Sequence, residues 1–584
     1  MAGKSLPDTG QGQVCGMIVG IDLGTTNSAI AVWRDNAPQL IPNALGEMLT
    51  PSAVSVGKDG TTYVGAAALD RLATHPESTG TSFKRYMGTE RKLRLGKTDW
   101  RPEDLSALVL RTLCDDAEAF LGTRPVEAVI TVPAYFNDRQ RKATRQAGEL
   151  AGLTVRRLIN EPTAAALAFG LQDQEDREPF LVFDLGGGTF DVSIVEKFEG
   201  VVEVRASAGD NRLGGDDFNT ALAVRMKPLV DPEGRLEKVD ARQREAMLHR
   251  AAETARRQLS AEDKASFALV LGEDRLAADV TTDMFEAACE DLLRRLREPV
   301  VRALRDCAFD VAELGDIVLV GGSTRMPVVR KAITRMFGRF PNSSVHPDHA
   351  VALGAAIQAG LLSRDAALDE IRIADVCPFT LGVDSAERDS RGQLQHGVFS
   401  PIIDRNTPVP VSRVSNYRTV QDNQKEILFN IYQGEAREVS SNIHLGAIKV
   451  PVPARPAGEA GADVRFSYDS SGMLEVDVTV HETGVTRNLV IAGEAETMTD
   501  REVAARREAL AKLKFHPRED AENVALMARA ERVYEDFVGD ERRMIGQWIT
   551  DFVGALDSQD PRRIADARAQ LQLQLDTASG PSIL

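Results

Sequence analysis

At 584 residues the chain is too long for a single hydrophobic core, so two to four domains are expected. A hydrophobic content of 43% and a charged content of 27% are ordinary for a soluble globular protein. The net charge of −17 argues against a nucleic-acid binder, because neutralising phosphates requires a basic surface. The charge fits cationic or neutral partners, and solubility alone explains it equally well.

The five cysteines lack the spacing of a metal site, a redox pair or a disulfide framework. Residues 1–16 contain no apolar run typical of a signal peptide, and we expect them to be a flexible extension. No stretch is long and apolar enough to span a membrane. The expected protein is a cytoplasmic monomer without nucleic-acid or membrane partners.

Residues 17–366 alternate short β-branched strands with helical stretches, which predicts an α/β domain. Within this range "VEAVITVPAYF" predicts a strand that runs into a loop. The next stretch, "NDRQRKATRQAGELAG", predicts a helix that ends at Gly152. Further on, "DIVLVGGSTRMPVVRKAITRMF" predicts a strand, a glycine turn and a helix.

Residues 367–378 form a short connector in this interpretation, and the pattern then changes. In residues 379–497 the runs "EILFNIYQGE", "NIHLGAIKVPVP", "ADVRFSYD" and "MLEVDVTVHE" predict an antiparallel β-sandwich. In residues 498–584, Thr499 and Glu502 have capping-box spacing. The stretches "REVAARREALAKLKF", "AENVALMARAERVYEDFV", "ERRMIGQWITDFVGAL" and "PRRIADARAQLQLQL" have helical periodicity, so a small helical unit is expected.

Two stretches of the α/β region share one pattern: "MIVGIDLGTTNSAIAVW" and "PFLVFDLGGGTFDVSIVEK". Because strands follow their glycines, neither is a Rossmann or Walker loop, and each predicts a β-hairpin whose turn offers backbone N–H groups to phosphate. Asp22 and Asp184, at matched positions, would repel phosphate unless a hard cation such as Mg²⁺ lay between. The pair therefore predicts two similar lobes that hold one nucleotide, although either hairpin alone could be an ordinary tight turn.

The motifs "VGIDLGTTNS", "VPAYFND", "INEPTAAALAFG", "FDLGGGTFDVS" and "VLVGGSTRMP" together resemble the seventy-kilodalton heat-shock chaperones of the DnaK type, over residues 17 to about 580. "DVCPFTLG", "GVFSPIIDRNTPVPVSRV", "NIHLGAIKVPVPA" and the short helical end are most similar to the bacterial HscC branch. The resemblance implies an actin-like two-lobed ATPase domain, a β-sandwich that binds extended apolar segments of unfolded polypeptides, and an α-helical lid. ATP would open the peptide site, and hydrolysis would close it.

The resemblance also assigns roles to residues at matching positions. Hydrolysis would depend on Lys84, Glu161, Asp184 and Thr189, with the Lys84 ammonium facing the γ-phosphate and the attacking water. Asp22, Asp184 and Asp191 would position Mg²⁺ and K⁺. The other contacts to ATP or ADP would come from Gly24, Thr25, Thr26, Gly186, Gly187, Gly188, Gly214, Gly215, Glu253, Arg256, Arg257, Ser260, Gly321, Gly322, Ser323, Arg325 and Asp348. The alternatives are a solvated surface lysine and a solvated charged face on the helix of Glu253.

In the sandwich, the resemblance implies a peptide pocket lined by Val383, Phe399, Ile403, Ile427 and Phe429. Ala386 and Val420 would form an arch over the peptide. The alternative is that these apolar residues are sandwich core, and for Phe429 both interpretations are equally open.

Coupling between the two sites would use a relay at Pro133 and Arg141, while Arg157 and Asp375 match positions that contact a J-domain co-chaperone. In "IRIADVCP", Arg372 and Ala374 occupy positions that are usually apolar, so less apolar surface is available for docking and looser coupling is expected. The segment "LSAEDKASFALVLGEDRLAADVTT" is shorter than is usual in the family, which leaves the need for a GrpE-type exchange factor open. The short helical end predicts weaker client trapping.

Two other classes use the actin-like fold, namely small-molecule kinases such as sugar kinases and filament-forming ATPases. Neither class has a reason to carry residues 375–580, so this region favours the chaperone.

Overall fold

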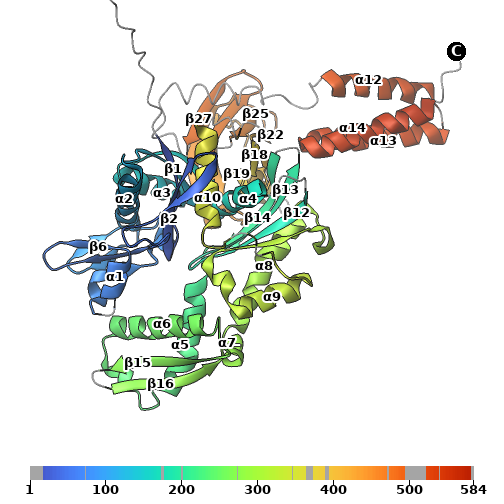
Figure 1. Cartoon of the computed structure of the whole chain (residues 1–584). Coiled ribbons are helices and arrows are strands. Elements are labelled where there is room, and N and C mark those ends of the chain that lie inside the picture. Colours follow the sequence, from blue (N-terminus) through green and yellow to red (C-terminus); the bar gives the residue numbers. More distant parts are fainter. Residues whose placement is uncertain are drawn as a thin grey trace, which may run out of the picture. The chain divides into compact units, whose positions relative to one another are not determined.

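The computed structural model describes residues 17–72, 74–172, 177–198, 201–271, 274–342, 344, 346–363, 368, 372–388, 393–469, 472–492, 521–537 and 539–579. These residues form two compact units (Figure 1). The first unit extends to Thr380 and also contains Asp404–Val409. The second contains Leu381–Ile403, Pro410–Asp469 and the described residues from Met473 onward.

The first sheet of the first unit is built around a β-hairpin. Its strands are β1 (Ile18–Asp22), β2 (Asn27–Arg34), β3 (Ala37–Ile41), β4 (Thr50–Pro51), β10 (Glu127–Val132) and β11 (Thr154–Asn160), and its long helices are α2 (Pro102–Leu121) and α3 (Asp138–Leu150). Strand β1 is antiparallel to β2 and parallel to β10. Helix α3 begins at a capping box, because the side chains of Asn137 and Gln140 each accept a hydrogen bond, 3.1 Å long, from the other's backbone N–H.

The second sheet repeats this arrangement. Its strand order is β17 (Ile317–Val320), β12 (Arg177–Leu185), β13 (Phe190–Phe198), β14 (Val201–Asp210), β18 (Arg372–Val376) and β21 (Pro408–Val409). Strand β12 is antiparallel to β13 and parallel to β17, as β1 is to β2 and β10. Both predicted hairpins are therefore present, and each is the centre of its own sheet.

Helices α4 (Glu161–Gln172) and α10 (Ala350–Leu362) share one buried core with residues of both sheets. The two helices approach so closely that a Cβ on Gly354 would lie 1.7 Å from the carbonyl oxygen of Ala164. A Cβ on Gly20 would lie 2.2 Å from the backbone nitrogen of Ala356, so α10 also lies directly on β1. Glycine at these positions is what lets the backbones meet.

Smaller elements complete the first unit. Between β4 and β10 in the chain are β5 (Ala53–Val56), β6 (Thr62–Val64), α1 (Ala66–Arg71), the 3-10 turn η1 (Pro76–Ser78), β7 (Thr79–Thr81), the 3-10 turn η2 (Phe83–Tyr86), β8 (Leu93–Leu95) and β9 (Thr98–Trp100). After β14 are α5 (Gly215–Val230), η3 (Arg235–Lys238), α6 (Ala241–Gln258), β15 (Lys264–Leu271), β16 (Asp274–Thr281), α7 (Thr282–Ala288), α8 (Glu290–Cys307), η4 (Val311–Glu313), η5 (Gly322–Arg325) and α9 (Pro327–Phe337). Two further apolar cores are formed around these elements.

The second unit contains two antiparallel sheets of four strands each. One has the order β20 (Leu394–Ile403), β19 (Leu381–Arg388), β23 (Glu426–Gln433), β24 (Ile443–Pro451), with the turn η7 (Val439–Ser441). The other has the order β22 (Val411–Arg418), β25 (Gly461–Tyr468), β26 (Met473–Val480), β27 (Thr486–Ala492). The four runs predicted as strands are β23 to β26, while β19, β20, β22 and β27 were not singled out from sequence.

Three helices follow: α12 (Ala521–Asp536), α13 (Gly539–Ser558) and α14 (Pro561–Ser579). They share an apolar core that includes Leu526, Ile545, Phe552 and Leu571. Three of the four helices expected at this end are therefore present. The fourth, "REVAARREALAKLKF", and the capping box at Thr499 lie outside the described residues, as do residues 1–16.

The connector contains a strand, because Arg372–Val376 is strand β18 of the second sheet. The predicted boundaries of the extension, the ATPase domain, the linker, the sandwich and the lid stay predictions. Within the described part of the chain, every helix is too short or too polar to cross a membrane.

Candidate functional site

The first unit contains a cavity of about 480 Å³ at the turns of both hairpins. Of the residues predicted to hold nucleotide or metal, the cavity is lined by Asp22, Gly24, Thr25, Thr26, Lys84, Glu161, Asp184, Gly186, Gly187, Thr189, Gly215, Glu253, Arg256, Arg257, Ser260, Gly321, Gly322, Ser323, Arg325 and Asp348. These residues come from segments throughout the first unit. Gly188, Gly214 and Asp191 do not line it.

The two hairpin turns contact each other directly. A Cβ on Gly187 would lie 1.7 Å from Thr26 Oγ1, and a Cβ on Gly188 would lie 2.5 Å from Thr25 Cγ2. A Cβ on Gly214 would lie 2.5 Å from the backbone nitrogen of Gly188. Gly188 and Gly214 therefore support the residues that line the cavity. Close packing explains why glycine is present at these two positions, without any contact to a ligand.

A buried ion pair lies among the carboxylates. Lys84, in η2, donates to Glu161 at the start of α4 with an Nζ–Oε1 distance of 2.5 Å, and the side chains are only 3% and 10% exposed. Asp22, at the end of β1, accepts a hydrogen bond of 2.9 Å from Thr131 Oγ1. The Lys84 side chain is thus held inside the cavity wall, which excludes the solvated surface lysine considered above.

Burial makes the neighbouring carboxyls weak acids. It raises the pKa of Asp22 to about 7, with a further increase from the charge of Glu161 and a decrease from Lys84. Burial and Glu161 likewise raise the pKa of Asp191 to about 8, although the backbone N–H of Tyr135, 3.4 Å away, opposes this. The pKa of Asp184 is also raised, by burial and then by the charges of Glu161 and Asp191. The site therefore holds more buried carboxyls than can ionise together, and a bound cation would favour their charged forms.

These shifts predict that the protein without nucleotide or metal loses stability as the pH rises. The folded state keeps protons on Asp22 and Asp191 up to pH 7–8, whereas the unfolded state loses them near pH 4, so the free energy of unfolding falls over that range. From pH 6.0 to pH 8.5 we expect the free energy of unfolding to fall by at least about 1 kcal/mol more in wild type than in Asp191→Asn, measured by urea unfolding. Equal losses in the two proteins would contradict the prediction.

The opposite end of the cavity is formed by α6, η5 and the turn before α10. Arg257 pairs with Glu253 at 2.7 Å, and Arg325 pairs with Asp348 at 2.6 Å. Arg256 Nε donates to Asn219 Oδ1 at 2.7 Å, and burial lowers the pKa of Arg256. The predicted shared face of Glu253 and Arg256 is therefore turned toward the cavity. Ser260 also lines it, from the turn after α6 rather than from the helix.

Sequence reasoning missed several lining residues: Asn27, Leu49, Asp216, Asn219, Pro347 and Val351. Two of them support predicted residues. Asn219 holds Arg256, and Asp216 accepts a hydrogen bond of 2.6 Å from Ser82 Oγ, two residues before Lys84. Their position in α5, directly after Gly214 and Gly215, is a signal that could have found them, because a helix that begins at a cavity wall presents its first turn there.

The lining fits a nucleoside triphosphate with a cation. Thr26 Oγ1 is buried and has no hydrogen-bond partner within the described part of the chain, which leaves a hydroxyl donor at the hairpin turn. Glycines of both turns allow a close approach to backbone N–H groups, which bind phosphate oxygens. Asp22 and Asp184 supply the carboxylates through which Mg²⁺ binds together with phosphate and water.

A chain of hydrogen bonds connects the loop of the relay residue Pro133 to the connector. Arg141 donates to the carbonyls of Phe136 and Ala134 and, at 2.6 Å, to Asn160 Oδ1. Asn160 Nδ2 in turn donates to Asp375 Oδ2 at 3.0 Å. Asp375 also accepts from Thr163 Oγ1 at 3.3 Å.

Asp375 lies in β18, the strand formed by the connector. Burial raises the pKa of Asp375, while its hydrogen bond with the Val376 N–H and the charges of Arg157 and Arg141 lower it. Arg157 is therefore close enough to act on Asp375. Ile373 packs against the core shared by α4 and α10 and Ala374 is half-buried, while the side chain of Arg372 lies outside the description.

Comparison with known proteins agrees with this arrangement. The family described as Hsp70 protein matches residues 18–94 and 91–578. The chain belongs to the Hsp70 family. It is 42% identical over 494 residues to the Chaperone protein DnaK of Thermotoga maritima, covering 83% of this chain and 81% of that protein. It is 38% identical over 608 residues to Chaperone protein DnaK 1 of a Synechococcus strain, covering 95% of this chain and 79% of that protein.

Membership of the Hsp70 family establishes the function at family level. The protein is an ATP-dependent chaperone of the DnaK type that hydrolyses ATP and binds unfolded polypeptides. The family's actin-like ATPase corresponds to the α/β sheets, and its β substrate-binding domain and helical lid correspond to the strands and helices of the second unit. A sugar kinase or a filament-forming ATPase is excluded, because the match extends to residue 578.

In the second unit of this Hsp70 the predicted peptide-pocket residues lie on the neighbouring strands β19, β20 and β23. One of them, Phe399, differs in the face of the sheet that it occupies. Val383 in β19 pairs with Ile431 of β23, so it shares a face with Phe429. Phe399 pairs with Asp384 and therefore lies on the opposite face from Val383. Two bulges in the β19–β20 pairing make this side assignment hard to predict from sequence.

The predicted residues of the pocket and its arch also differ in how deeply they are buried. Val383, Phe399, Ile403 and Phe429 are buried, whereas Ile427, Ala386 and Val420 are half-buried. Phe429 contacts the ring of Tyr417 edge-on, with centroids 5.6 Å apart. Sequence reasoning missed Tyr417, which also shares a hydrogen bond of 2.9 Å with Ser400.

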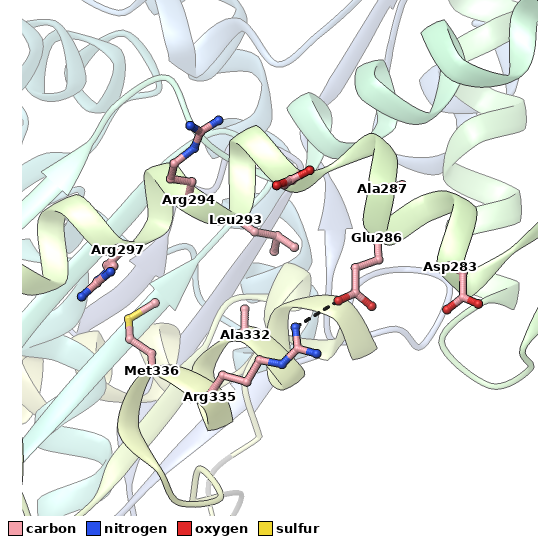
Figure 2. Close-up of a pocket in the computed structure, with 10 residues that line it drawn as sticks. Asp283, Glu286, Ala287, Leu293, Arg294, Arg297, Ala332, Arg335 and Met336 are labelled. Atoms are coloured by element: carbon pink, nitrogen blue, oxygen red, sulfur yellow. Dashed lines mark hydrogen bonds and ion pairs between the residues drawn. The ribbon is translucent and has the colours of Figure 1, made fainter.

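A second cavity of about 780 Å³ lies between α7, α8 and α9. Figure 2 shows Arg294 and Arg297 at one end, Glu286 and Asp283 at the other, and Leu293 and Ala332 between them. Glu286 is already paired with Lys331 and Arg335. The lining has neither the glycines nor the hydroxyls of the first cavity, so size alone does not identify the functional site.

Proposed function

We propose that the cavity of about 480 Å³ is the ATP site of this Hsp70. The observation that carries the proposal is the meeting of both hairpin turns with the buried Lys84–Glu161 pair in one cavity. Backbone N–H groups of the turns and the hydroxyls of Thr25, Thr26 and Thr189 bind the phosphates. Glu253, Arg256, Arg257, Ser260, Gly321, Gly322, Ser323, Arg325 and Asp348 hold the ribose and the base.

Hydrolysis in this proposal depends on positioning and charge. The Lys84 ammonium faces the γ-phosphate and stabilises the negative charge that develops there, while Glu161 keeps Lys84 in place and orients the attacking water. Asp22, Asp184 and Asp191 hold Mg²⁺ and K⁺, directly or through water. When bound, Mg²⁺ neutralises phosphate charge. Asp191 does not line the cavity, so we expect it to act through water or through Asp184.

We further propose that the protein belongs to the HscC branch and acts with a J-domain co-chaperone in the cytoplasm. The HscC branch rests on the motifs "DVCPFTLG" and "NIHLGAIKVPVPA". The J-domain partner rests on the connector region, where Arg157 acts on Asp375. The need for a GrpE-type exchange factor, the monomeric state and the weaker client trapping stay predictions. We propose that Val383, Phe399, Ile403, Ile427 and Phe429 line the peptide site, with Ala386 and Val420 as its arch.

The bonded chain from Arg141 through Asn160 to Asp375 supports coupling between the ATP site and the connector. We expect Asp375→Ala to abolish the stimulation of ATP hydrolysis by an extended apolar peptide and to leave the basal rate within about threefold, because each lost hydrogen bond to a charged group removes about 1.5–3 kcal/mol from the docked connector. Steady-state hydrolysis with and without peptide measures this. Asp99→Ala in β9, which removes a half-exposed carboxylate paired with Arg94, is the control that alters a carboxylate elsewhere. Full stimulation of Asp375→Ala would contradict the proposed route.

The expected loose coupling has its own test. Apolar residues at positions 372 and 374 would bury more apolar surface in the docked connector. Each such side chain would stabilise docking by up to about 3 kcal/mol. We therefore expect the Arg372→Leu, Ala374→Leu double variant to respond to peptide more strongly than wild type. A weaker or equal response would show that these two residues do not limit coupling.

A further inference from the structure

The segment "HPDHA", His346–Ala350, carries two histidines beside the nucleotide cavity. Pro347 and Asp348 line the cavity. The carbonyl of Pro347 accepts a hydrogen bond of 3.0 Å from the N–H of Gly321, which lines the cavity too. The backbone of the segment is therefore fixed against the site, and α10 begins directly after it.

His346 is a hydrogen-bond partner of a residue assigned to the base. Arg325 Nη2 lies 3.0 Å from His346 Nε2 and 2.6 Å from Asp348 Oδ2. A guanidinium can only donate, so Nε2 of His346 accepts and the imidazole carries its proton on Nδ1. Arg325 is thus held from two sides, once by a carboxylate and once by a neutral imidazole.

The plane of His346 is set by a second imidazole. The rings of His346 and His349 are stacked with centroids 3.7 Å apart and an interplanar angle of 22°. His349 is half-buried at the N-cap of α10, and its ring lies against that of His346, whose Nε2 faces Arg325. Stacking of this kind costs little when both rings are neutral and is disfavoured when either gains a positive charge beside Arg325.

We propose that His346 is a positioning residue for Arg325: its neutral imidazole holds the guanidinium against the base of bound ATP or ADP, and protonation of the imidazole releases it. This inference rests on the proposed function of the cavity, because it assumes that a nucleotide base lies beside Arg325. It adds a residue outside the predicted site and makes nucleotide affinity depend on pH.

The surroundings of His349 favour its neutral form. Burial lowers the pKa of His349, and the charges of His346 and Arg325 lower it further, while Asp348 raises it. Asp348 belongs to the same segment and Arg325 to η5. In the protonated imidazole of His346, Nε2 is a donor and the ring repels the guanidinium.

The test compares two variants by calorimetric titration with Mg-ADP at pH 7.5 and 5.5. His346→Ala removes the acceptor, and we expect about fivefold weaker binding at pH 7.5. His346→Asn keeps an acceptor that does not titrate, so we expect near-normal binding at pH 7.5 and a smaller loss at pH 5.5 than in wild type. The readout is the difference between variants in how the Mg-ADP affinity changes with pH. A difference is needed because the carboxylates that face the phosphates and the nucleotide itself also titrate.

Hydrolysis kinetics separate positioning from damage to the catalytic end. For His346→Ala we expect a raised KM for ATP and an unchanged single-turnover rate of bound ATP. The exposed His396, in β20 of the other unit, gives the control His396→Ala, which should match wild type in every assay.

Normal ADP affinity of His346→Ala at pH 7.5 would overturn the inference, and so would the same pH dependence in His346→Asn and wild type. If wild type bound no ADP, the proposed ATP site itself would be wrong. If wild type bound ADP and the His346 variants bound it with the same affinity, only the proposed role of His346 would be wrong.

Discussion

Replacing Lys84 with alanine is expected to lower the single-turnover rate of ATP hydrolysis by about 100-fold or more, because one preorganised charge that stabilises a transition state contributes this much. Lys84 is 2.5 Å from Glu161 and almost fully buried, so no water or mobile side chain can replace its charge without rearranging the site. The measurement is single-turnover hydrolysis of radiolabelled ATP at saturating enzyme.

The same variant separates catalysis from binding. The contacts assigned to the ribose and base lie on α6, η5 and the turn before α10, apart from Lys84 in η2, so ADP affinity should stay within about tenfold of wild type. Lys142→Ala, which removes a half-exposed lysine paired with Asp138, is the matched control and should hydrolyse ATP normally. A rate loss below about tenfold in Lys84→Ala would exclude Lys84 from the chemical step.

A single methyl group on Gly354 is expected to destabilise the first unit by about 3 kcal/mol or more, because overpacking against rigid backbone cannot be relieved by a side-chain rotation. The added Cβ of Gly354→Ala would lie 1.7 Å from the carbonyl oxygen of Ala164. Helices α10 and α4 would have to separate, and both share the core that contains strands of the two sheets. Urea unfolding of the first unit, followed together with ATP hydrolysis, measures the effect.

Gly170 in α4 provides the control for this substitution. Its added Cβ would lie 3.7 Å from Val202 Cγ2, an ordinary contact distance, so Gly170→Ala should be neutral or stabilise by up to about 1 kcal/mol through the lower entropy of the unfolded chain. If Gly354→Ala unfolded at the same urea concentration as Gly170→Ala, the close helix crossing would not be needed for stability.

The sequence predicted the residues that carry the chemistry of the site better than the residues that complete the cavity lining. The repeated Asp-Leu-Gly hairpins could be predicted because strands, not helices, follow their glycines, and both turns line one cavity. Asp216 and Asn219 follow the glycine pair, but this signal is weak, since an acidic and amide-rich start of a helix is also typical of a solvated surface. Gly188 and Gly214 were assigned to a ligand, yet Gly188 packs against the side chains of Thr25 and Arg85 and Gly214 packs against backbone, so close packing alone accounts for both glycines.

The connector and the sandwich show the limits of local patterns. "IRIADV" has too few apolar residues to predict a strand, and β18 forms because β14 and β21 offer unpaired edges on both sides. In the sandwich, alternation alone would place Val383 and Phe399 by counting, but the bulge between Ser385 and Ala386 shifts the register between them. Non-local pairing decides both cases, and a single sequence does not contain it.

The central claim is that ATP hydrolysis in the first unit responds to peptide bound by the second. Steady-state ATP hydrolysis by wild type, measured with and without a saturating extended apolar peptide, tests it most directly. The account predicts a severalfold higher rate with peptide, and no hydrolysis above background in Lys84→Ala under either condition. A wild-type rate that ignores a peptide shown to bind would contradict the coupling, even if the ATP site itself were correct.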